Sequence, residues 1–116
     1  MTKLPKTVKI GHLSYALSKT KEPLYHEGQA AWGLHSATRA SIVVSSDLPT
    51  APHEAEIVMH ECLHGLFDFF ELGQMEGITT AKEEMLVSTL SKGIVMLLKD
   101  NPKLTAYIVE SVKEKK

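Results

Sequence analysis

Two histidines and a glutamate near the middle of the chain have the spacing of a hydrolytic metal site. His60 and His64 stand at positions i and i+4, and Glu61 follows the first histidine. On a helix this spacing turns both imidazoles to one side, where they can hold one ion, with the carboxylate beside an ion-activated water. Zinc bound in this way polarises a carbonyl while the carboxylate takes a proton from the water. We therefore predict that His60 and His64 bind one Zn2+ ion and that Glu61 is the general base.

The segment around this motif is poor in charge. Apart from His60, Glu61 and His64, all positions from 57 to 66 are uncharged. The run from 56 to 70 has the apolar spacing of a helix. A helix of this kind is buried, and burying imidazoles and a carboxylate without partners is costly unless a metal or hydrogen bonds compensate. The alternative is a core helix whose histidines bond to backbone carbonyls and whose Glu61 lies at a solvated edge.

Length and charge limit the classes of function. With 116 residues, the chain is expected to form one domain, residues 1–116, around a single core. Thirteen basic and fourteen acidic residues give a net charge of -1, so no overall field attracts nucleic acid or an anionic membrane. The basic stretch at 113–116 is interpreted as a solvated helix end. We expect neither nucleic acid nor membrane as a partner.

The single cysteine and the lack of a long apolar run indicate the compartment. Cys62 has no partner for an intrachain disulfide, which fits a reducing cytoplasm. It lies two residues from each histidine and therefore points away from their side of the helix, so it is not a predicted ligand. The N-terminal residues contain no apolar signal core, and no segment is long enough to span a membrane. A cytoplasmic location is expected.

The residues before the motif predict a small sheet. Residues 7–17 are rich in β-branched and aromatic side chains and predict one strand with an irregularity near Gly11. Residues 18–28 predict a loop, and residues 29–35 and 39–45 predict two strands joined as a hairpin. The strand ending near Ser45 is expected to offer a free edge above the motif helix, where an extended peptide could add as a further strand.

Three helices are expected after the sheet. Pro52 suits the first turn of the motif helix, which should run to about Glu71 and stop before Gly73. Residues 80–83 have the form of a capping box and begin a second helix that ends at 98 or 99, and Asn101 with Pro102 begins a third. Strands followed by helices predict an α+β fold, in which a three-stranded antiparallel sheet covers a pair of helices and a C-terminal helix follows.

A catalytic zinc needs a third protein ligand, and the second helix offers Glu83 and Glu84. Glu83 lies in the middle of an apolar stripe formed by Leu86, Val87, Leu90, Ile94 and Leu97, which favours it. Glu83 also has a local role in capping, whereas Glu84 lies beside Ser88 and Ser91, whose small side chains suit a close approach of two helices. We choose Glu84 as the third metal ligand. The alternative is that both are first-turn acids favoured by the helix dipole.

With Glu84 on a later helix, the motif at 60–64 resembles that of the gluzincin metallopeptidases. Residues 9–15, the strand at 40–44, the metal motif and residues 83–102 together resemble the minimal ImmA/IrrE-like metallopeptidases of phages and mobile elements. The resemblance covers most of residues 8 to 102 and rests chiefly on the metal motif. It implies a zincin-type helical pair, zinc bound by His60, His64 and Glu84, and Glu61 as general base. It also implies a protein or peptide substrate, such as a repressor-type regulator, and the host cytoplasm if the chain is phage-encoded.

The chain departs from larger gluzincins around the metal ligands. Ser88 stands where an acidic or amide group often orients a ligand histidine, and Asp68 is a candidate substitute. An oxyanion stabiliser is not identified by the sequence. Four further side chains are candidates to reach the metal site after folding, namely His35, His53, Tyr25 and His26.

These features predict a small zinc-dependent peptidase. The alternative from another class is a binding or regulatory module of the same fold that keeps a structural zinc and grips a partner without cutting it. Hydrolysis of a non-peptide amide is a third, weaker hypothesis.

Overall fold

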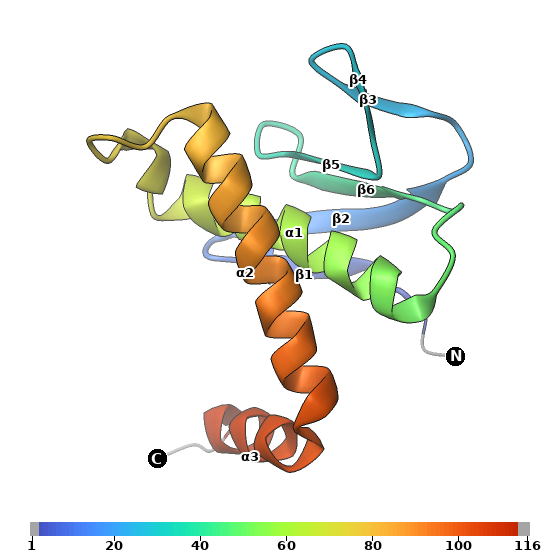
Figure 1. Ribbon diagram of the computed structural model, residues 1–116, viewed down its shortest axis with the longest axis vertical. Coiled ribbons are helices and arrows are strands. Elements are labelled where there is room, and N and C mark those ends of the chain that lie inside the picture. The colour runs from blue at the N-terminus through green and yellow to red at the C-terminus, as the bar shows by residue number, and fades with distance from the viewer. Residues whose placement is uncertain (1–2, 114–116) are drawn as a thin grey trace.

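The computed structural model describes residues 3–113 and shows an α+β fold with strands first and helices after. The short strands are followed by two long helices and a shorter C-terminal helix (Figure 1). The elements are β1 (Thr7–Ile10), β2 (Leu13–Thr20), β3 (Leu24–His26), β4 (Gln29–Ala31), β5 (Gly33–Ser36), β6 (Ser41–Ser45), α1 (Ala51–Phe69), the 3-10 turn η1 (Leu72–Gln74), α2 (Thr80–Asp100) and α3 (Pro102–Lys113). Within this described part, no helix is both long and apolar enough to cross a membrane.

The main sheet has four strands in the order β1-β2-β6-β5, so the predicted three-stranded antiparallel sheet is wrong. The predicted first strand is a hairpin, because Gly11 adopts φ +63° and the chain reverses between β1 and β2. β2 and β6 run parallel, since the long connection between them carries the chain back to the same end of the sheet. The predicted hairpin of the last two strands is confirmed as β5 and β6.

The predicted loop at 18–28 and the predicted strand at 29–35 are only partly correct, because residues 24–26 and 29–31 form strands of another sheet and only residues 33–35 belong to β5. β2 continues to Thr20, and β3 pairs with β4 in a separate two-stranded sheet. The chain changes sheets at Trp32, whose carbonyl accepts a hydrogen bond from the Ser45 amide at 2.8 Å. Because β6 is paired on both sides, the expected free edge of this strand is wrong, and the edge strands of the sheet are β1 and β5.

Helix α1 begins and ends close to its predicted limits. Thr50 is its N-cap and accepts a hydrogen bond from the His53 amide at 3.2 Å, and Pro52 lies in the first turn. The helix ends at Phe69, because the chain then turns into a left-handed conformation at Glu71. The Phe69 ring packs against the β1-β2 turn, where a Cβ on Gly11 would overlap the ring.

The caps of the next two helices differ from the prediction. Thr79, not the following threonine, caps α2 and accepts a hydrogen bond from the Lys82 amide at 3.1 Å. The predicted capping box is therefore wrong, and Glu83 has a different partner, described below. α3 begins at Pro102 as predicted, while the Asn101 side chain donates to the Leu97 carbonyl near the end of α2. Residues 114–116 of the basic tail lie outside the described residues.

The core lies on both sides of α1. Between the sheet and α1 it contains Ile10, Tyr15, Ile42 and Val44, and between α1 and α2 it contains Leu63, Phe67 and Val87. The predicted apolar stripe of α2 is only partly correct. Val87 and Ser91 are buried, whereas Leu86, Leu90 and Leu97 are exposed. The small Ser91 suits a close approach of α1 and α2, which carry the predicted metal ligands.

Candidate metal centre

The structure brings the three predicted metal ligands together. One potential ligand atom from each of His60, His64 and Glu84 lies within 4.8 Å of the other two. The Glu84 carboxylate spans the two rings, with Oε2 3.1 Å from His60 Nε2 and Oε1 3.0 Å from His64 Nε2. Two imidazole nitrogens and one carboxylate converge at the crossing of α1 and α2.

Helix geometry accounts for this convergence. His60 and His64 occupy successive turns of α1, and their ring centroids are 4.9 Å apart. Glu84 belongs to the second turn of α2, where α2 packs across α1 (Figure 1). The buried Val87 and Ser91 lie on the same side of α2 as Glu84, which places Glu84 next to the histidines of α1.

Glu83 and Glu84 take different positions at His64. Glu83 Oε2 accepts from His64 Nδ1 at 2.8 Å, while Glu84 faces Nε2 of the same ring. A carboxylate on the distal nitrogen fixes the tautomer and the orientation of a histidine that ligates metal. Glu83, one position before the predicted third ligand, therefore occupies the supporting position for which Ser88 offers no acid.

Ser88 supports the other half of the site. Its hydroxyl donates to Glu84 Oε2 at 2.9 Å. Partial burial acts to raise the pKa of Glu84, but the bonds from Ser88 and His64 and the attraction of His60 outweigh it, so this pKa lies below its usual value. Glu84 is thus held as a carboxylate facing both imidazoles.

Glu61 is the most buried acid at the centre, with 6% of its surface exposed. Burial, helped by repulsion from Glu84 and opposed by attraction to His64, raises its pKa to about 7. The close approach of β5 explains the burial, since a Cβ on Gly33 would lie 3.1 Å from Glu61 Oε2. Burial also lowers the pKa of His60, which favours the neutral imidazole that metals bind.

His35 and Asp68, two candidates named from the sequence, both lie at the centre, but Asp68 bonds to His35 and not to a predicted ligand histidine. His35 Nε2 lies 2.7 Å from Asp68 Oδ2, and its Nδ1 lies 3.9 Å from Glu61 Oε1. The His35 ring stacks on His64 with centroids 5.2 Å apart and planes 6° from parallel. Two sequence signals point here. Asp68 stands one turn after His64 on the same side of α1, and His35 shares the inward side of its strand with Gly33.

The other candidate side chains do not join the cluster. His53 packs edge-on against Trp32, with ring centroids 5.9 Å apart. Tyr25 and His26 lie on β3 and line a separate cavity. Cys62 packs against the core between the sheet and α1, as expected for a residue on the opposite side of the helix, and burial raises the pKa of its thiol.

The donor set suits a borderline-soft divalent ion better than a hard one. Two imidazoles and one carboxylate, with room for a further ligand, are typical of catalytic zinc, whereas magnesium and calcium prefer oxygen donors alone. The chain matches no protein-family model, and neither the curated proteins nor the solved structures gave a match. The geometry of the centre is therefore the basis for assigning a function.

Proposed function

We propose that the chain is a zinc-dependent peptidase of the gluzincin type, similar to the ImmA/IrrE-like enzymes. The observation that carries the proposal is the convergence of His60, His64 and Glu84 within 4.8 Å, with the buried Glu61 beside them. These four residues have the types and positions that metal-assisted hydrolysis of an amide requires.

The roles of the side chains follow from their contacts. His60, His64 and Glu84 would hold the ion, Glu83 would fix the His64 ring, and Ser88 would orient the Glu84 carboxylate. Zinc in such a site supplies acidification of a water and polarisation of the substrate carbonyl. With zinc bound, Glu61 would accept the proton of the attacking water and return it to the leaving amine, the role of a general base and then of a general acid.

β5 offers the place for an extended peptide. The Ser45 amide bonds to the Trp32 carbonyl at 2.8 Å. Because hydrogen-bonded residues alternate along an antiparallel pair, the backbone groups of residues 34 and 36 also point toward β6. The N–H and C=O groups of Gly33 and His35 then point to the open edge. A peptide added there would lie along the side of α1 that carries Glu61.

The test combines metal content with cleavage of a mixed peptide library, analysed by mass spectrometry. We expect about one zinc per chain in the wild type and in Glu61→Gln, and none in His60→Ala. Cleavage should fall on the order of a hundredfold or more in Glu61→Gln, because general-base catalysis contributes that much. His53→Ala alters a histidine of the same helix outside the cluster and should change neither quantity. Undiminished cleavage by Glu61→Gln would contradict the assigned mechanism.

A binding or regulatory module with structural zinc is the second candidate. It is favoured by the large apolar surface on the C-terminal helices, including Tyr107 at 69% and Val112 at 78% exposure, which a peptidase centre does not require. In that case zinc removal should lower the melting temperature, and a partner should bind wild type and Glu61→Gln equally. No library peptide would be cut by either protein.

A further inference from the structure

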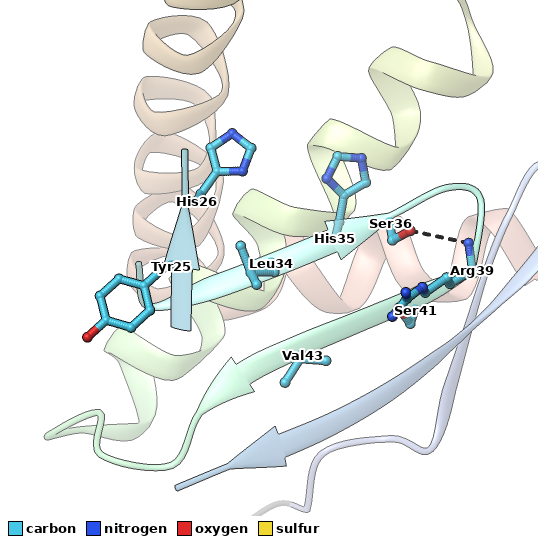
Figure 2. A pocket seen from close by; sticks show the side chains of 8 residues that line it. All are labelled: Tyr25, His26, Leu34, His35, Ser36, Arg39, Ser41 and Val43. Carbon is cyan, nitrogen blue, oxygen red and sulfur yellow. Dashed lines mark hydrogen bonds between the residues drawn. The ribbon is translucent and has the colours of Figure 1, made fainter. Parts of the chain in front are cut away.

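A cavity of about 330 Å³ lies beside the metal centre and has no role in the proposed chemistry so far. β3 crosses over β5 at one end of it, and the Arg39 side chain runs back along the strands toward Ser41 at the other (Figure 2). Its lining residues are Tyr25, His26, Leu34, His35, Ser36, Arg39, Ser41 and Val43.

Strand alternation places this cavity on the opposite side of the sheet from α1. Ile42 and Val44 pack into the core against α1, and Gly33 faces Glu61. The intervening positions, including Leu34 and Val43, therefore face outward into the cavity. His35 is the exception. It sits on the edge strand, borders the cavity, and also contacts His64 and Asp68 of the metal centre.

The cavity lining contains a basic side chain and no acidic one. Arg39 is among the lining residues, none of which is an acid, although acids outnumber basic residues in the chain as a whole. Among residues 3–113, no carboxylate lies within 4.0 Å of the Arg39 guanidinium. At the other end, Glu27 Oε1 lies 3.7 Å from His26 Nε2. Arg39 is thus the cation available to a ligand in the cavity.

The remaining lining residues suit a short apolar stem that ends in a carboxylate. Leu34 and Val43 oppose each other across the β5-β6 pair and form an apolar floor, while Ser36 and Ser41 form the next pair toward Arg39. Tyr25 borders the cavity from β3. A glutamate side chain has this order of groups, with methylenes for the floor and an anion for the guanidinium.

We propose that this cavity is a specificity subsite for an acidic side chain of the peptide bound along β5. The inference rests on the proposed function and adds the class of substrate. Side chains of an added strand alternate between the two sides of the sheet, so a residue whose neighbour faces Glu61 points into the cavity. Arg39 would pair with its carboxylate, and His35 marks the junction between the subsite and the metal centre.

The experiment compares peptides with blocked termini that carry Glu or Gln at each position around the cleaved bond. For the zinc-loaded wild type, we expect kcat/KM to be on the order of tenfold higher with Glu at one position, because a charge-assisted bond replaces a neutral one. Arg39→Gln should reduce this ratio to about one, and Arg39→Glu should prefer Lys over Glu at the same position. Lys21→Gln, at a second cavity bordered by Pro23 and Trp32, is the matched control and should keep the wild-type preference.

A binding measurement separates failure of the inference from failure of the proposed function. Calorimetry with zinc-loaded Glu61→Gln should show the same preference for Glu over Gln, lost when Arg39→Gln is added. Cleavage without any discrimination in the wild type would overturn the subsite and leave the peptidase intact. Binding that depends on Arg39 without cleavage would overturn the peptidase and support the subsite. Equal binding of Glu and Gln peptides would overturn the subsite in either case.

Discussion

The metal centre and the C-terminal helices differ in how they treat polar and apolar side chains. At the metal centre, Glu61 is buried, His60 and His64 are half-buried and Glu84 is exposed, and each has a partner within hydrogen-bonding or ion-pair distance. In the helical arm, which we define as residues 95–113, large apolar side chains are exposed and few contacts reach the rest of the molecule. α3 lies across the far end of α2, away from the sheet (Figure 1). The exposed apolar residues of the arm are Met96, Leu97, Leu98, Leu104, Tyr107, Ile108, Val109 and Val112.

The two regions contribute differently to the free energy of folding. Burying Glu61 and two histidines costs free energy, which the packing of α1 between the sheet and α2 must offset. The arm does not contribute to that packing, because its apolar residues stay in water. The metal centre should therefore depend strongly on its own ligands and on the core around α1, and only weakly on the arm.

The largest effect is expected from removing a metal ligand. His60→Ala deletes one of three protein ligands and should weaken zinc binding on the order of a thousandfold, about 4 kcal/mol, because ligation accounts for most of the affinity of such sites. Competition with a chelator of known affinity measures this change. His12→Ala, which alters a histidine beside Phe69 outside the cluster, should leave the affinity unchanged. A thousandfold loss in both variants would show that folding, not ligation, had been disturbed.

The next effect contrasts two valines. Val87 is fully buried between α1 and α2, so Val87→Ala removes packed methyl groups and should lower the free energy of unfolding by about 2 kcal/mol. Val112 is 78% exposed in the arm, and Val112→Ala should change that free energy by less than about 0.5 kcal/mol. Urea denaturation of both variants measures the difference. Equal losses would mean that the arm is packed against a partner under the conditions of the measurement.

Glu83→Gln distinguishes support of the metal centre from metal ligation. The amide can still meet His64 Nδ1 but loses the charge that strengthens that bond, so zinc affinity should fall about tenfold, much less than for a ligand. Glu84→Gln should show the far larger loss expected of a ligand. The reverse order of the two variants would assign the third ligand to Glu83. Glu71→Gln, after the end of α1, serves as the control.

The sequence predicted the metal centre better than the sheet for a physical reason. Helical spacing places His60 and His64 together by local geometry alone, and Ser88 and Ser91 indicated which side of α2 could approach. The parallel pairing of β2 with β6 depends on contacts distant in sequence, which local patterns do not encode. The role of Glu83 was missed because its spacing fits a local cap, and only tertiary structure shows that Thr79 takes that role and leaves Glu83 for His64.

The smallest effect, and the most direct test of the contrast, is the response of each region to zinc. Zinc stabilises the folded protein by mass action, so amides of α1 and of the first half of α2, which open only with the core, should exchange with solvent more slowly when zinc is bound. Amides of α3 should exchange fast in both states, because this helix can open without disturbing His60, His64 or Glu84. Hydrogen exchange followed by mass spectrometry, with and without a chelator, measures both. Slowing of α3 to the same degree as α1 would mean that the arm and the metal centre unfold as one unit, and the separation drawn between them would be wrong.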